Sequence, residues 1–157
     1  MDLPGSRLNG YRFVFGRDTN ILLRVARRSD PQHKLVDTAL ARLGGQGATF
    51  YYTHQNIAEF WNVMTRPVVR NGFGLTVTEA EREVRVIEAG MTFMPDSEAV
   101  YREWRRIVVQ YGISGVQVHD ARLAASMYVH GLKHILTLNV TDFSRFSGLA
   151  ALHPTSL

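Results

Sequence analysis

The sequence predicts a single α/β domain with a central, largely parallel sheet and helices on both faces. Short segments rich in β-branched and aromatic residues, typical of strands, alternate with segments whose apolar residues recur every three or four positions, typical of helices. Such alternation favours a parallel sheet, because parallel strands need helical crossovers between them. The 157 residues contain no internal repeat and no linker, so we expect residues 1–157 to form one domain.

The predicted elements follow one another in a regular order. Residues 1–10 are expected to be a mobile N-terminal extension. Strands are expected at residues 11–15, 48–53, 92–94, 134–138 and 149–153. Helices are expected at residues 21–28, 32–43, 57–66, 78–89, 97–111 and 119–130.

Glycine, proline and capping residues set the predicted ends of several helices. Gly44 and Gly45 are expected to end the second helix, because glycine readily adopts the left-handed conformation that stops a helix. Pro67 ends the third, since the residue before a proline avoids helical backbone angles. Thr78 and Glu81 have the spacing of a capping box, which predicts the start of the fourth helix.

Composition excludes several classes of protein. The chain has no cysteine, which rules out a disulfide framework, a zinc-thiolate site and a thiol nucleophile, and suits a reducing cytoplasm. The first residues lack a basic stretch followed by an apolar one, so no secretory signal is expected. No window approaches the roughly 18 apolar residues of a membrane span. We therefore expect a cytoplasmic protein with no membrane association.

The charge of the chain is compatible with a nucleic-acid partner. The formal net charge is +4, the pI is about 9.8, and the basic residues are mostly arginine. Arginine makes bidentate contacts to phosphate groups. An ordinary solvated surface explains the same charge equally well, so charge alone does not decide between the two.

Four acidic residues fall where a parallel sheet would gather them. Asp18 follows the first strand, and Asp142 lies shortly after the strand at 134–138. Asp120 lies at the start of a helix, and Glu59 lies off the apolar face of the helix after the second strand. Sites in open parallel sheets form beyond the carboxyl ends of the strands. Each acid also has a structural interpretation: a helix N-cap for Asp18 and Asp120, a solvated helix residue for Glu59 and a turn residue for Asp142.

A cluster of these acids predicts a divalent-metal site. Carboxylates within a few ångströms of one another repel, and their pKa values rise unless a cation lies between them. An all-oxygen ligand set without cysteine or paired histidines favours Mg²⁺ or Mn²⁺ over zinc. Such a cation can polarise a phosphodiester and lower the pKa of a bound water. The pattern is therefore typical of a nuclease.

Four motifs that contain these acids resemble those of the PIN-domain ribonucleases. The stretches are Asp-Thr-Asn-Ile-Leu-Leu at residues 18–23, the segment 55–67 around Glu59, His-Asp-Ala-Arg-Leu-Ala-Ala at 119–125, and residues 136–143 ending at Asp142. They occur in the family order and cover nearly the whole chain. The Trp-Asn-Val-Met-Thr-Arg-Pro stretch at 61–67 is similar to the VapC type, the toxins of bacterial toxin–antitoxin pairs.

The resemblance implies a fold, an activity and a set of partners. It implies a doubly wound sheet, a Mg²⁺ or Mn²⁺ cofactor and endonucleolytic hydrolysis of RNA. It also implies a cognate antitoxin and a homodimer. The metal-binding and catalytic acids would be Asp18, Glu59, Asp120 and Asp142. Nearby polar groups that orient a carboxylate or a water would be Thr19, Asn20, Thr137 and Asn139, although turn hydrogen bonding explains Asn20 equally well.

The two residues before Asp18 differ from the family pattern and keep another function open. Gly16 and Arg17 occupy positions where the family carries apolar residues, and Arg17 could pair with an acid or contact a substrate phosphate. A catalytically weak or inactive PIN-fold module that binds RNA or protein is therefore the alternative function.

The aromatic residues Tyr101 and Trp104 lie within a predicted helix, so packing in the core or against a second copy is expected ahead of base stacking.

Overall fold

The computed structural model describes residues 14–157 and contains a five-stranded parallel sheet in the order β3-β2-β1-β4-β5. The strands are β1 (Val14–Arg17), β2 (Thr49–Thr53), β3 (Thr92–Met94), β4 (His134–Leu136) and β5 (Ala150–Leu152). The predicted fold class is confirmed, and each predicted strand corresponds to an observed one. The predicted extension at residues 1–10 and the start of the predicted first strand lie outside the described residues.

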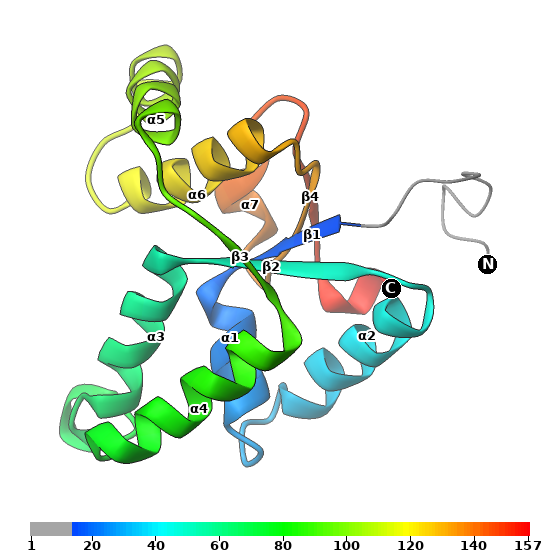
Figure 1. Ribbon diagram of the computed structural model, residues 1–157, viewed down its shortest axis with the longest axis vertical. Helices are drawn as coiled ribbons and strands as arrows, with labels where there is room; N and C mark the ends of the chain where they lie inside the picture. Colours follow the sequence, from blue (N-terminus) through cyan, green and yellow to red (C-terminus); the bar gives the residue numbers. More distant parts are fainter. Residues whose placement is uncertain (1–13) are drawn as a thin grey trace.

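Helices cover both faces of the sheet (Figure 1). They are α1 (Thr19–Ala26), α2 (His33–Gly45), α3 (His54–Thr65), α4 (Val77–Gly90), α5 (Glu98–Gln110), α6 (Gln117–His130) and α7 (Val140–Phe143), with short 3-10 helices η1 (Val68–Arg70) and η2 (Pro154–Ser156). In Figure 1, α1 to α4 lie on one side of the sheet and α5 to α7 on the other. No helix within residues 14–157 is both long and apolar enough to cross a membrane.

Alternate residues of the strands point to opposite faces and build separate cores. Phe50 of β2 and Leu136 of β4 pack with α1 and α2, whereas Ile135 of β4 packs in the cluster formed by α5, α6 and α7. A third cluster around Phe60 joins α1, α3 and α4. The period of two along each strand therefore explains why a central sheet of short strands can support two helical layers.

Two helix ends differ from the sequence prediction. Helix α2 continues through Gly44 and Gly45, and the left-handed residue comes later, at Gly47 with φ of 81°. The capping box of helix α4 lies two residues earlier than expected, because it is formed by Thr76 and Glu79. The Glu79 carboxylate accepts from the Thr76 backbone N–H at 2.8 Å. Both threonines have the capping-box spacing in the sequence, so the pattern alone could not choose between them.

Strand β1 continues through Gly16 and Arg17, where the family pattern was broken. A Cβ at Gly16 would lie 3.1 Å from the Met127 sulfur of α6, so the missing side chain lets this helix pack close to the strand. The side chain of Arg17 lies outside the described part of the structure, and the predicted contacts of Arg17 therefore stay a prediction.

The order of the strands creates a switch point between β1 and β4. The chain adds β2 and then β3 on one side of β1, and then returns to add β4 and β5 on the other side. The backbone N–H of Asp18, just after β1, donates to the carbonyl of Leu136 at the end of β4, at 3.1 Å. Crevices at such switch points are where open α/β sheets bind their ligands.

Candidate active site

The four predicted acids lie around the carboxyl edge of the sheet, near enough to this switch point for their charges to act on one another. Asp18 follows β1, Glu59 lies on α3, Asp120 lies in the first turn of α6, and Asp142 lies in α7, a short helix that the sequence did not predict. Burial first, and then the charges of Asp18, Asp142 and Glu59, raise the pKa of Asp120 to about 6. Acids contributed by four separate helical segments thus share one electrostatic environment.

The Asp18 side chain is turned toward the end of β4. Asp18 occupies the N-cap position of α1 but makes no capping hydrogen bond. Its Oδ2 instead accepts from Thr137 Oγ1 at 2.8 Å and from Asn20 Nδ2 at 2.9 Å. Burial raises the pKa of Asp18, and the Thr137 hydrogen bond opposes that rise. The N-cap interpretation therefore explains the backbone position of Asp18 but not its side chain.

Glu59 is held in place from two sides. Thr19 Oγ1 donates to Oε2 at 2.7 Å, and Gln55 Nε2 donates to Oε1 at 2.8 Å. Thr19 is itself fixed, because its hydroxyl accepts from the buried Asn56 Nδ2 at 3.1 Å. Asn56 also completes the capping box of α3 with Thr53. Glu59 is thus a half-buried, oriented carboxylate, and its interpretation as a solvated helix residue was wrong.

The supporting polar residues differ in what they contribute. Thr137 is fully buried and bonds Asp18 directly. Asn20 donates to Asp18 and also accepts from the backbone N–H of Leu138 at 3.4 Å, a contact between positions 118 apart and not one within a turn. Asn139 is exposed and contributes its backbone N–H to Thr137 Oγ1 at 3.0 Å.

The sequence did not single out Gln55, Asn56 and Arg145. Gln55 lies one helical turn before Glu59, the spacing at which two side chains on a helix meet, and this was the signal available. Asn56 lies three residues after Thr53, which is the spacing of a capping box. Arg145 follows α7, and its charge lowers the pKa of Asp120. Only the fold brings Arg145 near this acid, so no local pattern could have found it.

The acids fit a divalent cation by their chemistry. The carboxylates of Asp120 and Asp142 are half-buried and accept no hydrogen bond or ion pair from the described side chains. A cation that prefers oxygen ligands, such as Mg²⁺, would neutralise the negative charge of these two carboxylates and of the neighbouring Asp18 and Glu59. Within residues 14–157, however, no three histidine or acidic side chains are already arranged to hold an ion. Binding would require these side chains to move closer together.

Comparisons with known proteins agree with this architecture. Residues 17–149 match the model of the PIN domain family. No curated protein matches the chain. Among solved structures, one from the VapBC2 complex of Rickettsia felis bound to a promoter DNA fragment is 14% identical. It has a TM-score of 0.67 and covers 90% of this chain and 98% of that one.

Two further structures show the same likeness. FitAcB from Neisseria gonorrhoeae is 19% identical, with a TM-score of 0.64, covering 92% of this chain and 100% of that one. VapC20 from Mycobacterium tuberculosis, described as a Sarcin-Ricin loop cleaving toxin, is 14% identical. Its TM-score is 0.58, with 78% of this chain and 86% of that one covered. At such identities the likeness is one of fold. The family match extends from the end of β1 to the residue before β5, which is most of the chain, so this chain belongs to the PIN domain family.

Proposed function

We propose that this protein is a Mg²⁺- or Mn²⁺-dependent endoribonuclease that hydrolyses RNA phosphodiester bonds. The observation that carries the proposal is the group of four acids at the switch point, two of which have no partner among the described side chains. Membership of the PIN family supports it, and the excess of arginine suits a polyanionic substrate.

The residues of the site have distinct roles in this proposal. Asp18, Glu59, Asp120 and Asp142 would hold the cation, which would stabilise negative charge developing on the phosphate and make a nearby water more acidic. Thr137 and Asn20 keep Asp18 turned toward the site, and Thr19 and Gln55 do the same for Glu59. These hydrogen bonds fix two of the acids before a ligand arrives, which reduces the reorganisation that binding requires.

The biological role we propose is that of the toxin of a type II toxin–antitoxin pair, acting in the cytoplasm. The structures that share this fold include toxin–antitoxin complexes, and one of them is described as a Sarcin-Ricin loop cleaving toxin. A cognate antitoxin and a homodimer are the partners that this role implies. Co-expression with the protein encoded by the adjacent reading frame, followed by size measurement of the purified complex, tests both.

Asp18→Ala tests the catalytic proposal. The parent protein should cleave single-stranded RNA in the presence of Mg²⁺ or Mn²⁺, and EDTA should abolish cleavage. Asp18→Ala should lower the rate by about a hundredfold or more, because loss of one oriented charged group from a catalytic centre has effects of that order. Asp37→Ala is the matched control, since Asp37 is an exposed acid on α2 outside the cluster. If Asp18→Ala cleaves RNA at the parent rate, the proposal is wrong.

A non-catalytic module that binds RNA or protein is the second candidate. The observation that favours it is that no three acidic or histidine side chains in the described part of the chain are placed to hold an ion together. This function predicts binding of RNA without turnover, with an affinity that Mg²⁺ does not change. The same assay separates the two functions, because only an enzyme gives cleavage that depends on metal and on Asp18.

A further inference from the structure

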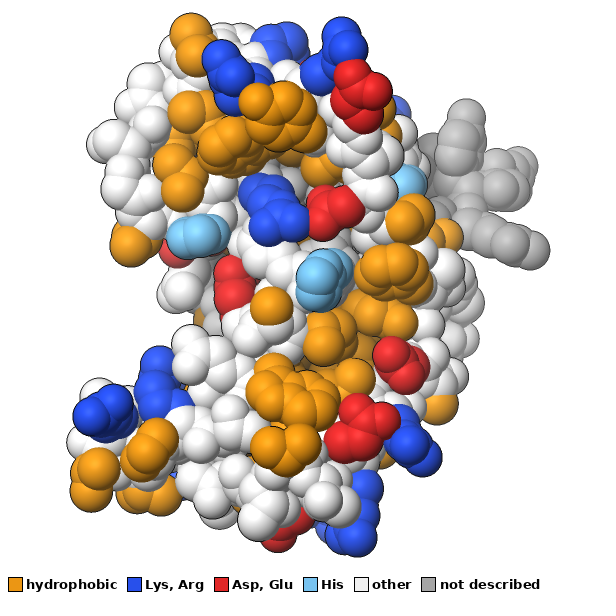
Figure 2. All heavy atoms as spheres, turned by 60° about the vertical axis from the view of Figure 1, so that its left-hand side comes forward, with side chains coloured by type: hydrophobic (Ala, Val, Ile, Leu, Met, Phe, Trp, Pro, Cys, Tyr) orange, Lys and Arg blue, Asp and Glu red, His pale blue; other side chains and the backbone are white. Residues whose placement is uncertain are grey.

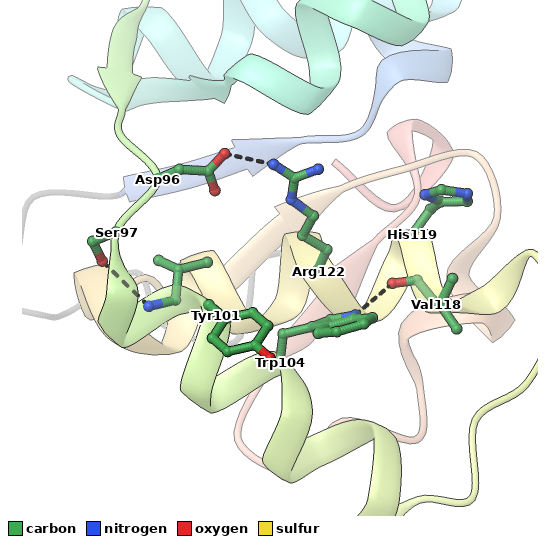
Figure 3. A pocket seen from close by; sticks show the side chains of 8 residues that line it. Asp96, Ser97, Tyr101, Trp104, Val118, His119 and Arg122 are labelled. Atoms are coloured by element: carbon green, nitrogen blue, oxygen red, sulfur yellow. Dashed lines mark hydrogen bonds and ion pairs between the residues drawn. The ribbon is translucent and has the colours of Figure 1, made fainter.

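An open groove lies between α5 and α6 (Figure 3). Its volume is about 550 Å³, and its walls include Tyr101 and Trp104 of α5, Val118, His119 and Arg122 of α6, and Asp96 before α5. Tyr101 is 54% exposed, so this ring does not pack in the core, while its packing against a second copy stays a prediction. In Figure 2, hydrophobic side chains gather in the upper part of the molecule, next to basic ones.

The two aromatic rings form a fixed platform along one side of the groove. The ring centroids of Tyr101 and Trp104 are 6.3 Å apart, and their planes differ by 33°. Trp104 Nε1 donates to the carbonyl of Val118 at 2.9 Å, which ties the indole to the start of α6. A pre-oriented aromatic surface of this kind binds a planar ring with little loss of side-chain entropy.

The groove is connected to the acids by short contacts. Val118 and His119 line it, and Asp120 is the next residue of the same helix. Gln55 Nε2 donates to the carbonyl of His119 at 3.0 Å while it also holds Glu59. A molecule in the groove would therefore lie next to the proposed reaction centre, as a nucleotide neighbouring the cleaved phosphate must.

The charges around the groove suit a nucleic acid. Arg102 and Arg106, on α5, are paired with Glu98 and Glu103. Arg105 differs from both, because its guanidinium donates to the Tyr101 hydroxyl at 3.1 Å and has no acidic partner among the described side chains. An unneutralised cation thus lies at the edge of the aromatic platform, where it can contact a phosphate.

We propose that this groove binds one unpaired nucleobase of the RNA strand, stacked on Tyr101 and Trp104, with Arg105 contacting a phosphate of the same strand. This inference rests on the proposed function. Aromatic platforms beside arginine are a common means of binding single-stranded RNA. The remaining face of α5 carries charged side chains, which are depleted in the cores of protein interfaces, so a second copy fits this surface less well.

Binding of single-stranded RNA tests the stacking. A fluorescein-labelled hexaribonucleotide is titrated with protein in the Asp18→Ala background, where RNA should stay intact, and its anisotropy gives Kd. Tyr101→Ala should weaken binding about tenfold, and Tyr101→Phe, which keeps the ring, should stay within about twofold. Phe93→Ala is the matched control, because Phe93 is a 48% exposed aromatic residue on β3 that does not line the groove. Equal binding by Tyr101→Ala and Phe93→Ala would overturn the proposal.

Arg105→Ala tests the phosphate contact. It should weaken binding and reduce the slope of log Kd against log salt concentration by about 0.7, the value for one phosphate contact to a single strand. Arg102→Ala is the control, since Arg102 lies on the same helix, is exposed and is paired with Glu98. If the two variants have the same salt slope as the parent, Arg105 does not contact the RNA.

Fluorescence gives a second measurement that does not need a truncated side chain. In the Trp61→Phe variant, Trp104 is the only tryptophan, and its emission should be quenched by the hexaribonucleotide. An abasic strand with the same phosphates should leave the emission unchanged. Quenching that is equal with both strands would contradict base stacking.

The outcomes also separate this inference from the proposed function. With the native acids present, Tyr101→Ala should cleave RNA with a KM raised about tenfold and a similar kcat, as expected when binding is lost equally in ground and transition states. If Tyr101→Ala shows metal-dependent cleavage with an unchanged KM, the proposed base binding in the groove is wrong, while the proposed nuclease activity stands. A parent protein that neither binds nor cleaves RNA would overturn both. Dissociation of a dimer by Tyr101→Ala in sedimentation would show that a second copy covers the groove, against the proposal.

Discussion

At the residue scale, the charge of Asp120 is the least favourable feature of the site without a cation. Its pKa of about 6 in the folded protein exceeds the ordinary value of 3.8, mainly through burial and then through repulsion by the other acids. The folded state therefore binds this proton more tightly than the unfolded state does. Stability falls as the pH rises through this interval, and the full cost is present above a pH of about 6.

Asp120→Asn should consequently stabilise the protein in EDTA at neutral pH. We expect a gain of about 1 kcal/mol, reduced from the face value of the pKa shift because the side chain is half-exposed, and a Tm higher by about 2–4 °C. The gain should disappear toward a pH of about 3, below the ordinary value of 3.8, where the Asp120 carboxyl is protonated in both the folded and the unfolded state. Thermal melts at both pH values measure it, with Asp37→Asn as the control. An unchanged Tm at neutral pH would show that burial and the neighbouring acids do not disfavour the charge of Asp120.

At the element scale, helix ends were the part of the fold that local patterns described least well. Gly44 and Gly45 were expected to stop α2, but the helix contains both, and Gly47 adopts the left-handed conformation instead. Any of the three could end a helix, because glycine lacks the Cβ that disfavours a positive φ. In the structure the backbone N–H of Ala48 donates to the Leu43 carbonyl at 3.0 Å and that of Gly47 to the Gly44 carbonyl at 2.9 Å, so the helix closes at Gly47.

A pair of alanine substitutions tests this reassigned helix end. Gly44→Ala should stabilise the protein by about 0.5–1 kcal/mol, since Gly44 is helical and no atom lies within 4 Å of an added Cβ. Gly47→Ala should destabilise it by about 1 kcal/mol, because its φ is 81°. Urea denaturation measures both values. If Gly44→Ala is the more destabilising of the two, the helix ends where the sequence pattern first placed it.

At the scale of the whole molecule, the site joins segments that are distant in the chain. The hydrogen bond between Thr137 and Asp18 spans 119 positions, and the one between Thr19 and Glu59 spans 40. A cation bound by all four acids would therefore connect α3, α6, α7 and the start of α1. Any ligand that binds only the native arrangement stabilises it by mass action.

Mg²⁺ should accordingly raise the Tm of the entire domain, and more so at neutral than at acidic pH. At about one hundred times its Kd the gain is about 2.7 kcal/mol, or about 5–10 °C. At a pH of about 5 the gain should be much smaller, because Asp120, with a pKa of about 6, must lose its proton to bind the ion. Calorimetry with and without Mg²⁺ at the two pH values measures this. The same shift in Asp120→Asn as in the parent would exclude Asp120 as a ligand.

The sequence by itself determined the fold class, the order of the elements and the identity of the acidic residues. Periodicity and turn residues act over a few positions, so they predict β2 and α5 well. Only the tertiary structure decided how Glu59 is held, that Arg145 approaches Asp120, and that Tyr101 and Trp104 form an open groove. These facts depend on which elements the strand order brings together, and the sheet places β4 beside β1 through contacts far apart in the chain. The acids were visible in the sequence because each follows a local motif, whereas their partners are set by packing.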